Sequence, residues 1–315
     1  MKIYFTIACF FYLLVNGMIS QTWIPPGESE RCPCKWGKDD QRGSVNHMNP
    51  STILRATKLV KQGKSIELRH VLSSTMPFFG TRTFNLNTKR TFYYPQSNHR
   101  GSNEEYITGE MGQVGTQFDG FAHQMIGNSF YNCFKIDSIA TRNGFDKLGI
   151  ENVGTLITRA VLIDIAGLKN VEMLPDHYEI TSNDLQQALI RQRLEILPGD
   201  AVIIHTGFGK LWNKDNLRFT RSQPGLGVEA ALWIAKKDPM LVGSDNSVIE
   251  VNPNPDPKLS LPVHQIMLVV NGIHLLENMK LDELMQAGVQ EFEIIVQPLK
   301  MQGATGSTVA PVALF

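Results

Sequence analysis

The sequence is poor in cysteine, with four among 315 residues, and no second close pair accompanies Cys32 and Cys34 to complete a zinc knuckle. It has no Gly-x-Ser-x-Gly elbow, and its glycine-rich tail, Gly303-Ala-Thr-Gly-Ser307, lacks the Gly-Lys-Ser/Thr of a phosphate-binding loop. The 30 basic and 30 acidic residues balance to a net charge of zero. A basic face is therefore not expected, and nucleic acid is excluded as an expected partner.

The one long apolar run is at the N-terminus, where residues 3–19 follow Lys2 and a polar stretch begins at Ser20. The run is slightly long for the apolar part of a signal peptide and short for a membrane span. Gly17 and Ser20 suit a cleavage site. We expect residues 1–20 to be a signal peptide, with a retained membrane anchor as the alternative. The mature chain is then expected to be secreted, or in the secretory-pathway lumen, without a stable membrane span.

Cleavage after residue 20 would leave three cysteines, Cys32, Cys34 and Cys133. A secretory route permits a disulfide. A bond between Cys32 and Cys34 would be strained, because only Pro33 separates them. We expect Cys133 to pair with Cys32 or with Cys34; the alternative is three free cysteines.

The organisation of the chain is that of an α/β protein, because strand patterns alternate with helical ones after residue 160. Residues 21–50 are rich in Pro, Gly, Cys and charge and are interpreted as an N-terminal arm, and residues 51–315 as one domain. Residues 74–103 are expected to be ordered loop and hairpin covering another part of the domain. Helices are predicted at 51–62, 185–194, 228–236 and 281–287, and strands at 65–71, 160–165, 201–206, 240–244 and 292–297.

The densest polar cluster is Gln113-Val-Gly-Thr-Gln-Phe-Asp-Gly-Phe-Ala-His123. In an extended segment Gln113, Gly115, Gln117 and Asp119 would face one side. His123 would return to the same site if a turn begins at Gly120. The alternative is a hydrogen-bonded edge with a buried aspartate satisfied by local amides.

A second candidate group lies far along the chain. His264 precedes an apolar stretch, and Glu277 follows another, where an unpaired carboxylate is costly. The alternative for Glu277 is a helix-capping or salt-bridged glutamate. Asp245 and Glu250 follow a predicted buried strand, where ligands of α/β sheets tend to bind. His205, at a strand end, is interpreted as structural.

At these residues the chain resembles the cyclase-like metal-dependent hydrolases, a family that includes bacterial kynurenine formamidase and isatin hydrolase. The family motif His-x-Gly-Thr-His-x-Asp-x-x-x-His is here the segment from Gln113 to His123, with glutamine at the first two histidine positions. Similarity extends over most of the chain, including Trp36–Gly43, Thr158–Asp164, Pro198–Asp200, His205–Gly207, Leu241–Asp245, Gly272–Asn278 and Gly303–Ser307. The resemblance implies a single domain with a mixed β-sheet core flanked by helices.

The resemblance also implies roles for individual residues. Asp119 would be a metal ligand, His123 the acid/base, and His264 and Glu277 distal ligands. Gln113 and Gln117 stand where the family has ligand imidazoles. Because amide oxygens are hard donors, a site that includes them would favour Mn or Mg over Zn. Phe118, Phe121 and Tyr131 could shape a substrate pocket, although core packing is the alternative for each.

The implied activity is hydrolysis of an amide or cyclic amide C–N bond, as in tryptophan catabolism, on a small-molecule substrate. Water activated by a divalent ion would attack the carbonyl, and His123 would carry the proton. The glutamines also permit a secreted ligand-binding relative with reduced or no catalysis, in which both amides bind a substrate carbonyl without metal. A lyase or dehydratase is a third possibility. A homodimer or larger oligomer is implied by the resemblance alone.

Overall fold

The computed structural model describes residues 22–315, and of residues 91–93 only the backbone. The expected signal peptide, residues 1–20, lies outside the described residues. Within the described part, nine strands form one mixed sheet in the order β1-β15-β13-β7-β9-β11-β12-β4-β14. Their bounds are β1 (Ser65–Glu67), β4 (Gln117–Asp119), β7 (Leu156–Asp164), β9 (Ala201–His205), β11 (Leu241–Ser244), β12 (His274–Glu277), β13 (Glu291–Val296), β14 (Gly306–Thr308) and β15 (Val312–Leu314).

The centre of the sheet is parallel, with β7, β9, β11 and β12 side by side. The first three are runs of Val, Ile, Leu and Ala buried on both faces, which is typical of parallel strands covered by other layers. On the outer sides β13 joins β7, β4 joins β12 and β14 joins β4, each antiparallel. The predicted α/β class with a mixed sheet is therefore confirmed.

Both faces of the sheet are covered. Val161 and Ile163 of β7 enter one hydrophobic cluster, to which α5 (Ser182–Gln192) and α7 (Val228–Ala235) contribute, while Ala160 and Leu162 enter another on the opposite face. Helix α2 (Pro50–Thr57) contacts β7 and β13; it is shorter than the predicted 51–62. The remaining helical segments are α1 (Glu28–Arg31), α3 (Ile136–Ile139), α4 (Ile165–Leu168), α6 (Asn216–Arg221), α8 (Pro262–His264), α9 (Asp282–Gln286), the 3₁₀ turns η1 (Gly43–His47), η2 (Tyr131–Cys133), η3 (Ile150–Asn152) and η4 (Phe208–Leu211), and the π-helical η5 (Gln265–Asn271).

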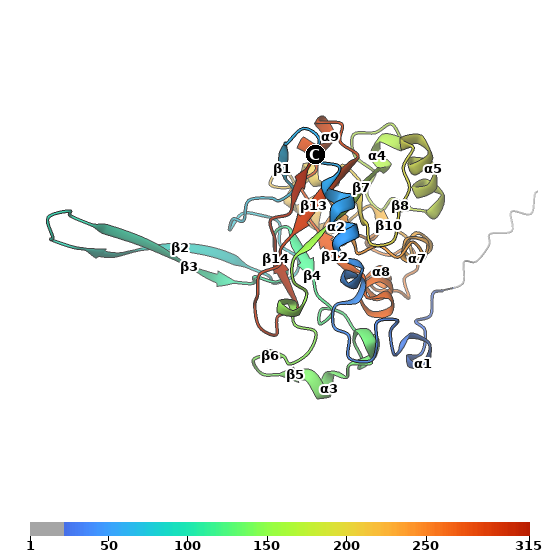
Figure 1. Ribbon diagram of the computed structural model, residues 1–315, viewed down its shortest axis with the longest axis horizontal. Coiled ribbons are helices and arrows are strands. Elements are labelled where there is room, and N and C mark those ends of the chain that lie inside the picture. The colour runs from blue at the N-terminus through green and yellow to red at the C-terminus, as the bar shows by residue number, and fades with distance from the viewer. Residues whose placement is uncertain (1–21) are drawn as a thin grey trace, which may run out of the picture.

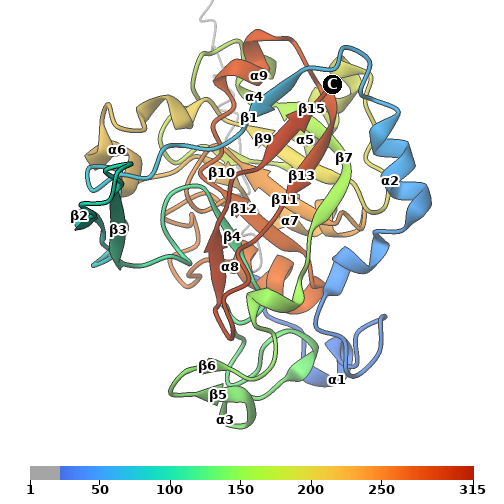
Figure 2. The same cartoon turned by 60° about the vertical axis from the view of Figure 1, so that its left-hand side comes forward.

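A long hairpin leaves the body of the molecule. Strands β2 (Phe84–Tyr93) and β3 (Gly101–Gly109) pair antiparallel and project outward as the β2–β3 hairpin (Figures 1 and 2). The prediction of a hairpin here is correct, but the expectation that residues 74–103 as a whole cover the domain is wrong. Only the base of the hairpin packs on the body, where Met76 and Phe84 join a cluster with Val114 and Phe208. Two small pairs are β5 (Ala140–Thr141) with β6 (Gly144–Phe145) and β8 (Glu179–Ile180) with β10 (Gly225–Leu226).

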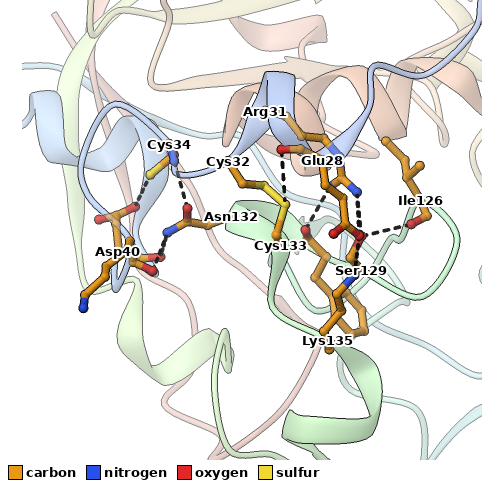
Figure 3. Close-up of a disulfide and its surroundings, with 12 residues drawn as sticks. Glu28, Arg31, Cys32, Cys34, Asp40, Ile126, Ser129, Asn132, Cys133 and Lys135 are labelled. Carbon is orange, nitrogen blue, oxygen red and sulfur yellow. Dashed lines mark hydrogen bonds and ion pairs between the residues drawn. A yellow bond between two sulfur atoms is a disulfide. The ribbon is translucent and has the colours of Figure 1, made fainter.

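The described part of the N-terminal arm, residues 22–50, is bonded to the segment around residue 130. A disulfide joins Cys32 to Cys133, and Cys34 is a free thiol (Figure 3). Beside the disulfide, Asn132 donates hydrogen bonds to three carbonyl oxygens of the arm and accepts one from the Cys34 amide. The arm thereby reaches the polar motif: a Cβ at Gly43 (φ +56°) would lie 2.5 Å from the Phe121 ring.

Among residues 22–315, none of the helices combines the length and the apolar character that crossing a bilayer requires.

Candidate active site

The polar motif enters the sheet as a strand of three residues, β4, between β12 and β14. The expected extended run from Gln113 to Asp119 is therefore too long, because Gly115, with φ +68°, turns the chain before the strand begins. Within β4, alternation puts Gln117 and Asp119 on one face and Phe118 on the other.

A turn at Gly120 brings His123 back toward Asp119, since the His123 amide donates to the Gly120 carbonyl at 3.0 Å. His264, at the end of α8, reaches the same place from the other half of the chain, with its Nε2 3.7 Å from Asp119 Oδ2. One side-chain atom of each of Asp119, His123 and His264 lies within 4.8 Å of those of the other two. The structure thus groups three of the residues singled out in the sequence, from two separate segments.

Asp119 is fully buried, and neither of its carboxylate oxygens has a hydrogen-bond partner among the residues that the structure describes. A buried carboxylate without compensation is strongly unfavourable. Two imidazoles and a carboxylate are common ligands of divalent transition metals. A divalent cation therefore fits this group, with Asp119 and His264 as ligands.

His264 is oriented by a residue that the sequence did not connect with it. Glu250 accepts hydrogen bonds from the Val263 and His264 amides and lies 2.6 Å from His264 Nδ1. With Nδ1–H donating to this carboxylate, Nε2 is directed toward Asp119 and Glu277, and its lone pair becomes available to a metal when the Nε2 proton leaves. Carboxylates orient metal-binding histidines in this way.

Glu277 lies on the other side of His264, with Oε1 3.1 Å from His264 Nε2. It is opposite Gln117 in the β12–β4 ladder, and Gln117 Nε2 donates to its Oε2 at 2.7 Å. Gln117 Nε2 also donates to Gln113 Oε1 at 2.9 Å. The two glutamines are therefore linked to each other and to a carboxylate through this nitrogen. The Gln113 oxygen, the atom by which an amide would bind a metal, accepts a hydrogen bond from Gln117.

Burial and neighbouring charges shift the pKa values of this group. Burial lowers the pKa of His123, against the opposing effect of Asp119, so its imidazole is neutral near pH 7. Burial and the negative charge of Asp119 raise the pKa of Glu277 to about 7. For His264 burial acts against the charged form, but hydrogen bonds to Glu250 and Glu277 outweigh it and raise the pKa well above its ordinary value.

The aromatic residues expected to shape a pocket lie in the core instead. Phe118 is fully buried in the cluster on the opposite face of the sheet from Asp119. Phe121 and Tyr131 are buried against each other with ring centroids 4.4 Å apart, and the Tyr131 hydroxyl donates to Asp40. These contacts agree with core packing, the alternative expected for each of the three residues.

A separate polar group lies at the ends of β7 and β9. His205 Nδ1 is 2.7 Å from Asp164 Oδ1, and Asp245 accepts from the Thr206 amide and hydroxyl. The contacts of these residues are with one another, in keeping with the structural role expected for His205. Arg82, at the base of the hairpin, is a further residue missed in the sequence: its positive charge lowers the pKa of both His123 and Glu277.

Comparison with known proteins agrees with this architecture. A family model described as "Putative cyclase" matches residues 66–251. A crystal structure described as that of a novel cyclase is 34% identical over 89% of this chain and 98% of its own, with a TM-score of 0.81. The comparison with curated proteins gave no match.

Two more distant structures share the fold. Isatin hydrolase A from Ralstonia solanacearum is 22% identical over 84% of this chain and 98% of its own, with a TM-score of 0.57. An isatin hydrolase bound to the product analogue thioisatinate is 19% identical over 85% of this chain and 99% of its own, with a TM-score of 0.61.

The contact between Glu250 and His264 leads to a testable expectation. In Glu250→Gln an amide nitrogen replaces one acceptor oxygen, so His264 loses its fixed orientation. We expect the affinity for Mn²⁺, measured by calorimetry, to fall about 10- to 100-fold. Glu172→Gln is the matched control, because that side chain is 94% exposed. Unchanged Mn²⁺ affinity in a folded Glu250→Gln protein would contradict the assignment.

Proposed function

Because the chain belongs to the cyclase family, we propose that it is a metal-dependent hydrolase that opens the C–N bond of a cyclic amide or of an arylformamide. The observation that carries the proposal is the buried Asp119 carboxylate, without hydrogen-bond partners and next to His123 and His264. The relatives described as isatin hydrolases support a cyclic amide as the substrate class.

The metal would be held by Asp119 and His264, with Glu277 adjacent. When bound, a divalent cation lowers the pKa of water and polarises a carbonyl oxygen. Of the ions expected from the sequence, Mn²⁺ suits this set better than Mg²⁺, because it accepts imidazole as well as carboxylate ligands.

His123 would carry the proton. Burial lowers the pKa of its imidazole, and its side chain is of intermediate exposure, whereas Asp119 and His264 are buried. A neutral imidazole accepts a proton from the attacking water and returns it to the leaving nitrogen as the C–N bond breaks. The products are then an amine and a carboxylate.

A turnover assay with isatin and N-formylkynurenine, with Mn²⁺, Mg²⁺ or Zn²⁺ added, tests the proposal. His123→Ala is expected to lower kcat about 10²- to 10⁴-fold at saturating metal, which is the usual contribution of a general acid/base. His177→Asn, at an exposed histidine outside the site, is the control. Full activity of His123→Ala would refute its role. Binding of isatin by the wild-type protein without turnover under any metal would favour the ligand-binding alternative.

We further propose that the chain forms a homodimer or larger oligomer through the β2–β3 hairpin. Leu86 and Ile107 lie opposite each other on this hairpin and are 54% and 42% exposed. A two-stranded hairpin is marginally stable alone in water, and exposed apolar groups favour a partner surface. The same hairpin on a second copy of the chain provides a symmetric partner.

Light scattering after size-exclusion chromatography tests the role of the β2–β3 hairpin in oligomer formation. We expect the wild-type mass to be a multiple of the monomer mass and the double variant Leu86→Asp/Ile107→Asp to be monomeric, because two charges would have to be buried in the interface. Leu217→Asp is the control, since Leu217 is 77% exposed on the body. A monomeric wild-type protein, or a double variant of unchanged mass, would rule out this interface.

Secretory routing is also proposed. Its support is the Cys32–Cys133 disulfide, a bond that persists in oxidising compartments. Expression in a secreting cell line should release protein that begins at Gln21, and non-reducing peptide mapping should recover Cys32 linked to Cys133 with Cys34 alkylated. Cell-bound protein that keeps residues 1–20 would instead indicate the membrane anchor.

A further inference from the structure

The register around β4 determines which side chains share a face with Asp119. Asp119 lies between Leu275 of β12 and Gly306 of β14, and Gln117 lies between Glu277 and Thr308. Directly paired residues in neighbouring strands project to the same face. The neighbour of Asp119 on the β14 side is therefore a glycine, which leaves space next to the carboxylate.

The amide of Gln113 occupies that space. A Cβ built on Gly306 would lie 2.6 Å from Gln113 Nε2. Since this Cβ would project to the Asp119 face, Gln113 Nε2 lies on that face too, next to the metal-binding group. Any side chain at position 306 would displace it.

The orientation of the Gln113 amide follows from its neighbours. The oxygens of Glu277 accept hydrogen bonds, so Gln117 presents its nitrogen to this carboxylate. The same nitrogen donates to Gln113 Oε1, which leaves Gln113 Nε2 pointing away from Gln117. That nitrogen is buried and has no acceptor within residues 22–315. A buried N–H donor without an acceptor is unfavourable, because it has lost its hydrogen bonds to water, and an acceptor from a ligand would relieve it.

We propose that Gln113 Nε2 donates a hydrogen bond to the carbonyl oxygen of the substrate, and that Gln117 is the positioning residue that aims it. The inference rests on the proposed hydrolase function. As water adds to the carbonyl carbon, negative charge develops on that oxygen, and a fixed donor in a buried site stabilises the charge. The first glutamine of the motif is then a hydrogen-bond donor to substrate, and its oxygen is held by Gln117 and is not a metal ligand.

Gln113→Leu separates the two roles, since it removes the amide with little change in size. We expect Mn²⁺ affinity by calorimetry to stay within about threefold of wild type, while kcat for isatin falls about 10²- to 10³-fold, the effect of removing one oxyanion donor. Gln113→Glu, which keeps the shape but replaces the donor with an acceptor, should also lose turnover without losing Mn²⁺. Gln186→Leu is the control. Gln186 is exposed on α5, and its side-chain amide donates a hydrogen bond to the Ser182 carbonyl of the same helix.

The positioning role of Gln117 is tested by a double-mutant cycle. Gln117→Leu should lower kcat, and the Gln113→Leu/Gln117→Leu protein should be no worse than Gln113→Leu alone, because Gln117 acts through Gln113. Additive losses would overturn the positioning role.

Three results would overturn the Gln113 inference. They are loss of Mn²⁺ binding in Gln113→Leu, a Mn²⁺-loaded crystal structure with Gln113 Oε1 on the ion, and wild-type turnover in Gln113→Leu. Absence of turnover by the wild-type protein on the whole substrate panel would instead overturn the proposed function, and this inference with it.

Discussion

Asp119 is buried in a place where the sheet offers it no hydrogen-bond donor. Its two neighbours in the ladder, Leu275 and Gly306, have no polar side chain, and the backbone amides around it serve the strands. Both carboxylate oxygens are buried and have no hydrogen-bond partner among the described residues. A carboxylate kept in this state needs a cation, and His123 and His264 are placed where such a cation would sit.

The three carboxylates of the site differ in how well they are satisfied. Glu250 has two backbone amides and the imidazole of His264, and Glu277 has the amide of Gln117. Only Asp119 has no hydrogen-bond partner in the described chain. Glu250, with both oxygens hydrogen-bonded, is fixed in position and can orient His264. Asp119, with no hydrogen-bonded oxygen, and Glu277, with Oε1 unpartnered within residues 22–315, keep oxygens available to an ion.

Local features of the site and sheet could be predicted from the sequence, and long-range ones could not. The apolar runs of β7, β9 and β11 identified the central strands, and the turn at Gly120 placed His123 near Asp119. The contact of Glu250 with His264 spans an irregular segment without periodicity, so no pattern indicated it. For Phe118 the sequence leaves two roles open, and the alternation within β4 places its side chain on the opposite face from Asp119, in the core. Aromatic and polar composition indicated the hairpin but not its direction.

Exchange of two imidazoles for amides changes the ligand set of the proposed enzyme. If His123 moves the proton, His264 is the one remaining nitrogen ligand in the described part of the site, and the other donors are carboxylate oxygens of Asp119 and Glu277. An oxygen-rich set holds zinc less selectively than several imidazoles do, which favours Mn²⁺. Fewer protein ligands also leave more positions for water and a substrate carbonyl. The glutamines are therefore compatible with catalysis, because the Gln113 amide can share with the metal in polarising the substrate carbonyl.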